Sequence, residues 1–335
     1  MTTYTSIMET IFLQPVTSPM QKSTIFTSMA LLAVIFLTSA CSASNGSSTP
    51  EPEVILTNYQ TGLVSGQGNM YALLVGINEP NADFAPLERP AAEIDSLEIF
   101  LNSQNYRVTT LKNEQATKKA ILDLIDQTMA TAKTDDRVLF YFAGHAGTLD
   151  SLWQKLAPSL KDSILSLDAA TSNAQFSDKE FFLIPRQKTN KRGATELVSF
   201  QEIVQHMDTP HRSIHQRVVI IDACFGGYFV NQSLLSSNIY GNVPADGFYA
   251  LTSVKSTVAD GAYFPFILQG LRGDADLYVE GNRNGRVGLY ELSLFLDAMV
   301  ALRHADKLGE SFFSRYIMVG SGPMDLAISN AVVPN

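Results

Sequence analysis

RVLFYFAGHAG (residues 137–147) and RVVIIDACFGG (residues 217–227) are the two stretches of this chain that say most about its fold. Each begins as an unbroken apolar run and ends in glycine. Unbroken apolar runs are typical of central strands in a parallel sheet, which helices cover on both faces. Open sheets of this kind bind ligands just beyond the carboxyl ends of their strands. His145 and Cys224 follow the two runs at that point, so we expect a functional site there.

From about residue 71 the chain alternates strand-like and helix-like segments. This pattern predicts an α/β fold with a mainly parallel six-stranded sheet, flanked by helices on both faces. Helices are predicted over 91–102 and 117–132, where apolar residues recur at helical spacing, and Ser199 and Glu202 predict a capping box that opens another helix. The predicted strands are 71–77, 106–111, 137–143, 181–185, 217–222 and 247–253.

Cys224 and His145 have the residue types of a nucleophile and its base. A thiol with the usual pKa near 8.5 is mostly protonated at neutral pH, so a nucleophilic cysteine needs a base. His145 could accept that proton and later return it to the leaving amine. Glycines beside both residues would let the backbone approach a substrate closely. The alternative is structural, because a free cysteine or a lone histidine beside an apolar strand often only packs in the core.

YFAGHAG with the downstream VVIIDACFGG resembles the caspase-like cysteine peptidases, in particular the bacterial metacaspase-like (orthocaspase) branch. The resemblance implies a caspase-like sandwich and a cysteine endopeptidase with a Cys224/His145 dyad. The animal caspase signature has Gln before Ala-Cys, whereas Asp222 stands there in this chain. The similarity covers about residues 71–325 and includes YALLVGINEP, LERPAAEIDSLEIFL, FFLIPR, GFYALTSVKSTVAD, FPFILQGLRGDAD and NGRVGLYEL.

The same resemblance implies a substrate pocket and an oxyanion hole. In metacaspases the acidic residue two places before the nucleophile selects Arg or Lys before the scissile bond, and Asp222 matches it. A carboxylate there would pair with a guanidinium, although Asp222 could instead bond to nearby backbone. Glu93 stands where the family has a second pocket aspartate, and its longer side chain could narrow the pocket. The oxyanion N–H groups would come from Ala146 and Cys224.

The N-terminal region predicts export and lipid anchoring. Residues 1–40 form a predicted signal peptide, whose true start is Met20 if the preceding residues are an annotation artefact. Its ending resembles a bacterial lipobox, which implies that Cys41 is lipidated. The lipid would anchor the protein in the bacterial cell envelope, facing the periplasm. Ser42, directly after the cysteine, favours the outer membrane. An ordinary secretory signal is the alternative. Residues 41–69 predict a polar tether, and 70–335 the peptidase domain.

The composition limits the classes of molecule that this chain is expected to bind. The chain has 335 residues, 45% of them hydrophobic, and its net charge is −9 from 24 Lys and Arg against 33 Asp and Glu. Nucleic acids need a basic surface, so we expect a peptide or protein substrate and no nucleic-acid partner. A catalytically silent scaffold for protein binding is the competing function. A nucleotide-binding domain lacks support, because no G-x-G-x-x-G or P-loop pattern follows the first strand.

Three further clusters have weaker functional interpretations. Residues 280–291 have the spacing of an EF-hand loop but begin with Glu and hold only two carboxylates, so a turn is favoured over calcium binding. His206, His211 and His215 favour a solvated loop over a zinc site. Lys188, Lys191 and Arg192 form a basic loop, either a self-cleavage site or a solvated turn. No metal ligand is assigned, but metacaspases often need calcium elsewhere, so calcium is a candidate activator.

Overall fold

The structure is a computed structural model, which describes residues 68–162, 181–188, 193–207, 216–223, 248–252, 263–303, 317–319 and 327–330. The chain divides into two compact units, Met1–Val54 and Ile55–Asn335, and every described residue belongs to the second. The predicted signal peptide and Cys41 lie outside the described residues. Among the helices of the described ranges, none has the length and apolarity needed to cross a membrane.

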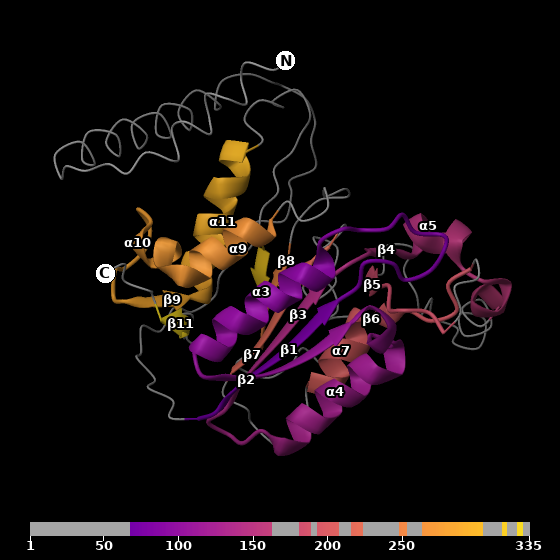
Figure 1. The fold of residues 1–335 in the computed structure, drawn as a ribbon, viewed down its shortest axis with the longest axis horizontal. Helices are drawn as coiled ribbons and strands as arrows, with labels where there is room; N and C mark the ends of the chain where they lie inside the picture. Colours follow the sequence, from indigo (N-terminus) through magenta and orange to yellow (C-terminus); the bar gives the residue numbers. More distant parts are fainter. Residues whose placement is uncertain are drawn as a thin grey trace, which may run out of the picture. The chain divides into compact units, whose positions relative to one another are not determined.

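A six-stranded sheet forms the centre of the fold and confirms the predicted class (Figure 1). Five of its strands are parallel, and the sixth, β10, runs antiparallel to β8 at one edge. The central strands have almost every side chain buried, as expected for a sheet that is covered on both faces. In spatial order the strands are β10 (Ile317–Val319), β8 (Phe248–Thr252), β7 (Gln216–Asp222), β3 (Arg137–Ala143), β1 (Met70–Gly76) and β2 (Tyr106–Lys112).

The predicted strand at 181–185 does not belong to this sheet. Its first three residues form β5 (Phe181–Leu183), which pairs antiparallel with β4 (Ala146–Thr148) and β6 (Val198–Ser199) in a separate sheet. An apolar run cannot tell which partner it will have, and Pro185 limits its length because proline donates no ladder hydrogen bond. The sixth strand of the main sheet is β10, which the sequence analysis missed. A third sheet pairs β9 (Arg286–Gly288) with β11 (Ala327–Asn330).

Helices cover both faces of the main sheet (Figure 1). On one face, α3 (Pro90–Ser103), α9 (Phe264–Gln269) and α11 (Leu289–Arg303) contribute to one hydrophobic cluster. On the other face, α4 (Lys118–Thr131) and α7 (Phe200–Met207) pack against the sheet. The shorter helical segments are η1 (Asn113–Gln115), α5 (Leu149–Leu152), η2 (Trp153–Lys155), η3 (Gly270–Asp274) and α10 (Ala275–Leu277).

The helix predictions from apolar spacing are confirmed. Ile94, Leu97 and Leu101 of α3 are all buried, and α4 buries its own stripe with Leu124 partly covered. The predicted capping box opens α7: the backbone N–H of Ser199 donates to Glu202 Oε2 at 2.9 Å, and the N–H of Glu202 donates to Ser199 Oγ at 3.1 Å. This exchange satisfies two donors that a helix start would otherwise leave unpaired.

Candidate active site at the carboxyl edge of the sheet

The register of the three central strands aligns their carboxyl ends. Gly76 of β1 pairs with Ala143 of β3, and Ala143 pairs with Asp222 of β7. His145 follows Ala143 by two residues. Asp222 is the last residue of β7, and Cys224, two residues further, lies outside the described residues. The two predicted catalytic positions therefore follow directly paired strand ends.

His145 is held by two consecutive residues of the loop between β1 and α3. Its Nε2 atom lies 2.7 Å from the carbonyl oxygen of Ala85. The ring of Phe84 packs against the imidazole, with the two ring centroids 5.2 Å apart and the planes inclined by 45°. His145 is half-buried, whereas Phe84 is buried. Sequence analysis missed both residues, because nothing in the motif around Phe84 distinguishes it from an ordinary core aromatic.

The contact with Ala85 determines which nitrogen of His145 can act as a base. A carbonyl oxygen only accepts hydrogen bonds, so Nε2 must carry the hydrogen. In the neutral imidazole the other nitrogen, Nδ1, is then the proton acceptor. The loop thus selects the tautomer as well as the orientation of the ring.

The loop that carries Phe84 and Ala85 is itself held from the segment after β5. Arg186 donates from its NH1 nitrogen to the carbonyl oxygen of Glu79 at 2.7 Å, and the backbone N–H of Gln187 donates to Pro80 O at 3.1 Å. The N–H of Gly193 donates to the Asp83 carboxylate. The ammonium group of Lys155 lies 4.6 Å from the centroid of the Phe84 ring. Residues far apart in sequence therefore fix the support of His145.

Ala146 begins β4 directly after the histidine. The N–H of Ile184 donates to His145 O at 3.0 Å, and Ala146 pairs with Leu183 in the next position of this antiparallel ladder. Hydrogen-bonded and non-hydrogen-bonded pairs alternate in such a ladder. The N–H of Ala146 therefore points away from β5.

The carboxylate of Asp222 lies on the face of the sheet that α3 and α9 cover, because Val218 and Ile220, at the same alternation, pack in that cluster. The hydroxyl of Tyr141 in β3 donates to Asp222 Oδ2 at 3.2 Å. The Tyr141 ring also meets Phe264 of α9 edge-on, with the ring centroids 6.5 Å apart. Asp222 is thus tied to a neighbouring strand through a side chain that sequence analysis did not select.

Glu93 lies in the first turn of α3 and is only 6% exposed. Asn78 places this turn: its Oδ1 accepts from the N–H of Ala91 at 2.9 Å, and its own N–H donates to Asn113 Oδ1 at 2.9 Å. A carboxylate in the first turn is also favoured by the positive end of the helix dipole. Because α3 covers the face of the sheet on which the Asp222 carboxylate lies, Glu93 and Asp222 are on the same side of the sheet.

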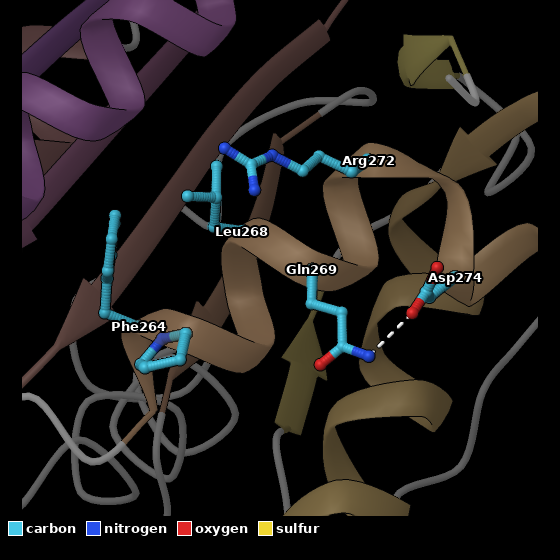
Figure 2. A pocket seen from close by; sticks show the side chains of 6 residues that line it. Phe264, Leu268, Gln269, Arg272 and Asp274 are labelled. Atoms are coloured by element: carbon cyan, nitrogen blue, oxygen red, sulfur yellow. Dashed lines mark hydrogen bonds between the residues drawn. The ribbon is translucent and has the colours of Figure 1, made fainter. Parts of the chain in front are cut away.

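A small pocket lies on the surface formed by α9 and η3 (Figure 2). It contains none of the predicted site residues, but Phe264 lines it and also contacts Tyr141. Gln269 closes one side by donating from Nε2 to Asp274 Oδ2 at 2.6 Å. The remaining lining residues are Pro265, Leu268 and Arg272. The pocket is therefore next to the support of Asp222 without being part of the predicted site.

The EF-hand-like segment at 280–291 is a turn held by carboxylates. Glu291 accepts from the N–H groups of Asn282 and Gly288 at 2.8 and 2.9 Å, one with each oxygen. Asp276, outside the motif and 2% exposed, accepts from the N–H groups of Asn284 and Gly285 at 2.9 and 3.0 Å. Across the described residues, no group of three His, Cys, Asp or Glu side chains could hold a metal ion.

The other two clusters are described only in part. His206 lies in α7, not in a connecting loop as expected, and its Nδ1 is 2.7 Å from Asp126 Oδ1; His211 and His215 lie outside the described residues. In the basic loop, Lys188 pairs with Glu196 at 3.2 Å, while Lys191 and Arg192 lie outside the described residues.

One comparison with known proteins agrees with the motifs. A family model described as "Caspase domain" matches residues 69–279, well over half of the chain. Among solved structures, the chain is similar to protein GSU0716 from Geobacter sulfurreducens, with 12% sequence identity and a TM-score of 0.49, over 78% of this chain and 97% of that one. The search of curated proteins found no match.

Proposed function

This chain belongs to the caspase domain family, and from that premise we propose that it is a cysteine endopeptidase with Cys224 as the nucleophile and His145 as the general base. One observation carries the proposal. His145 has its Nε2 committed to Ala85 O, so Nδ1 is its basic nitrogen, and its strand is aligned with the strand that leads to Cys224. We assign the chain to the metacaspase-like (orthocaspase) branch on the motifs alone.

The reaction then follows from these groups. His145 Nδ1 takes the thiol proton of Cys224, and the thiolate attacks the carbonyl carbon of the scissile bond. The N–H groups of Ala146 and Cys224 stabilise the developing oxyanion. His145 returns the proton to the leaving amine, and water hydrolyses the thioester with His145 again as the base. The direction of the Ala146 N–H supports this part of the proposal.

The proposed substrate has Arg or Lys before the scissile bond. Asp222 and Glu93 would supply the negative charge that recognises the cation, and both lie on the same side of the sheet. A partly desolvated carboxylate pairs well with a guanidinium and repels an acidic side chain. Calcium is a proposed activator.

The test is hydrolysis of short reporter peptides that end in Arg, Lys, Gln or Asp, each with and without calcium. We expect cleavage of the basic reporters, lost in both Cys224→Ala and His145→Ala. Cys41→Ser serves as the matched control, since it removes the chain's other cysteine and should leave cleavage intact. A wild type that binds these peptides but cleaves none of them would favour the scaffold function.

We also propose that Cys41 is lipidated and holds the protein at the outer membrane, facing the periplasm. The lipobox-like ending of the apolar run supports this. Metabolic labelling with a palmitate analogue, followed by membrane fractionation, tests it. We expect label and membrane association in the wild type and neither in Cys41→Ser. A soluble, unlabelled wild type would instead favour an ordinary secretory signal.

A further inference from the structure

Tyr141 begins the YFAGHAG motif, but neither the motif nor the family assignment gave it a role. It lies in β3 directly opposite Ile220, it is fully buried, and its hydroxyl reaches Asp222 Oδ2 at 3.2 Å. We propose that Tyr141 is a specificity-determining positioning residue, which orients the Asp222 carboxylate for a guanidinium or ammonium group of the substrate. The inference rests on the proposed function, because it gives Asp222 the role of the pocket acid.

The hydroxyl is matched to the charge state that such a pocket needs. When Asp222 is ionised, its oxygens can only accept hydrogen bonds, so the Tyr141 hydroxyl is the donor in this contact. Hydrogen bonds to charged acceptors are stronger than those between neutral groups, and they favour the charged form. The contact with Oδ2 thus holds the carboxylate from the side of β3. Tyr141 thereby acts on the substrate through Asp222.

The position of the hydroxyl is itself fixed by packing. The Tyr141 ring belongs to the cluster beneath α3, α9 and α11, and Phe264 of α9 meets it edge-on. A ring enclosed in a close-packed interior has few alternative rotamers. The hydroxyl is therefore placed before any substrate arrives, which is the condition for a positioning group to be effective.

Tyr141→Phe tests the inference, because it removes only the hydroxyl from a buried ring. Without that donor, the Asp222 carboxylate loses a contact that orients it. We expect the KM for Arg and Lys reporters to rise by about tenfold, the lower end for a hydrogen bond to a charged group. We expect kcat, and the slow cleavage of a Gln reporter, to change little. A purely structural tyrosine would instead affect all reporters equally.

Two further variants make the result specific. Tyr71→Phe is the matched control: it removes the hydroxyl of a buried tyrosine on β1 that packs on the opposite face of the sheet, and should preserve the KM. Asp222→Asn completes a double-mutant cycle. If Tyr141 acts through Asp222, adding Tyr141→Phe to Asp222→Asn should have no further effect on KM. Additive effects would overturn the inference.

A binding measurement separates this inference from the proposed function. Acetyl-arginine amide is titrated into the purified full-length chain by calorimetry, where we expect about tenfold weaker binding by Tyr141→Phe. If the wild type cleaves no reporter but binds this ligand in a Tyr141-dependent way, the inference stands and the peptidase proposal fails. If the wild type cleaves Arg reporters and Tyr141→Phe has the same KM, only the inference fails. A wild type that does not bind the amide overturns the inference as well.

Discussion

The imidazole Nε2 of His145 and the carbonyl oxygen of Ala85 lie 2.7 Å apart, although 60 residues separate them in the chain. The neighbouring residue, Phe84, packs its ring against the same imidazole. One short loop therefore controls the tautomer through its backbone and the ring orientation through its side chain. A small displacement of a catalytic group can lower the reaction rate strongly, so changes in this loop should alter activity through the position of His145.

Phe84→Leu should lower kcat strongly and the free energy of unfolding only slightly. Leucine keeps most of the buried volume but loses the aromatic contact with His145, so we expect kcat on an Arg reporter to fall by about tenfold or more. The control is Phe295→Leu in α11, another buried phenylalanine, which packs in a different hydrophobic cluster from Phe84. Both variants should lose about 1 kcal/mol of unfolding free energy in urea. An equal loss of kcat in both would show that Phe84 has no particular role.

Gln187→Leu should loosen the basic loop. The buried Gln187 side chain donates to the carbonyl oxygens of Pro185 and Glu196, and its Oε1 accepts from Thr195 and from the N–H of Glu196. Leucine leaves these groups unpaired, so we expect unfolding free energy to fall by about 3 kcal/mol.

Limited trypsin digestion measures the same change locally. Cleavage after Lys188, Lys191 or Arg192 should become faster in Gln187→Leu. The reason is that the segments before and after the loop both lose their hydrogen bonds to the Gln187 side chain. Gln127→Leu is the control, since Gln127 is exposed on α4. A digestion rate for Gln187→Leu that equals the wild-type rate would contradict the role of Gln187.

Asp276→Asn should destabilise the turn before α11. The substitution turns one accepting oxygen into a donor that faces a backbone N–H, so we expect a loss of about 2 kcal/mol in unfolding free energy. The exposed Asp274→Asn should change it by about 0.5 kcal/mol or less. Thermal melts with and without calcium extend the test. A calcium-dependent rise in Tm that Asp276→Asn abolishes would show that this segment is a calcium site after all.

Tyr106 should make the fold sensitive to alkaline pH. Burial raises the pKa of Tyr106 far above its ordinary value of 10, and the charge of Arg137 offsets this only partly. Above pH 10 the unfolded chain therefore loses this proton while the folded chain keeps it, and stability falls as pH rises. At pH 11 this one tyrosine should lower the free energy of unfolding by about 1.4 kcal/mol relative to neutral pH.

The measurement compares guanidinium unfolding at pH 8 and pH 11. Tyr106→Phe should lose less stability between the two pH values than the wild type, because phenylalanine has no proton to lose. Both values are differences within one variant, so any effect of the substitution at pH 8 cancels. Equal losses in the two proteins would mean that Tyr106 does not contribute.

Local sequence patterns were enough to predict the fold class, the five parallel strands of the main sheet and two of the helices that cover it. Continuous apolar runs predicted the central strands and period-3.6 spacing predicted α3 and α4, because these patterns are local and the sheet buries both faces. The capping box at Ser199 was predictable for the same reason, since both partners lie within one turn. His145 was recognisable as a candidate from its place after a central strand, and Asp222 from the resemblance to metacaspases.

Which strands pair and which side chains meet depended on tertiary packing. Phe181–Leu183 joined a separate sheet, and Ile317–Val319 completed the main one, because strand pairing depends on segments distant in the chain. The contacts of Ala85 with His145 and of Tyr141 with Asp222 span 60 and 81 residues, and no local pattern encodes them. The sequence thus identified the groups that can react, whereas packing determined which neighbours orient them.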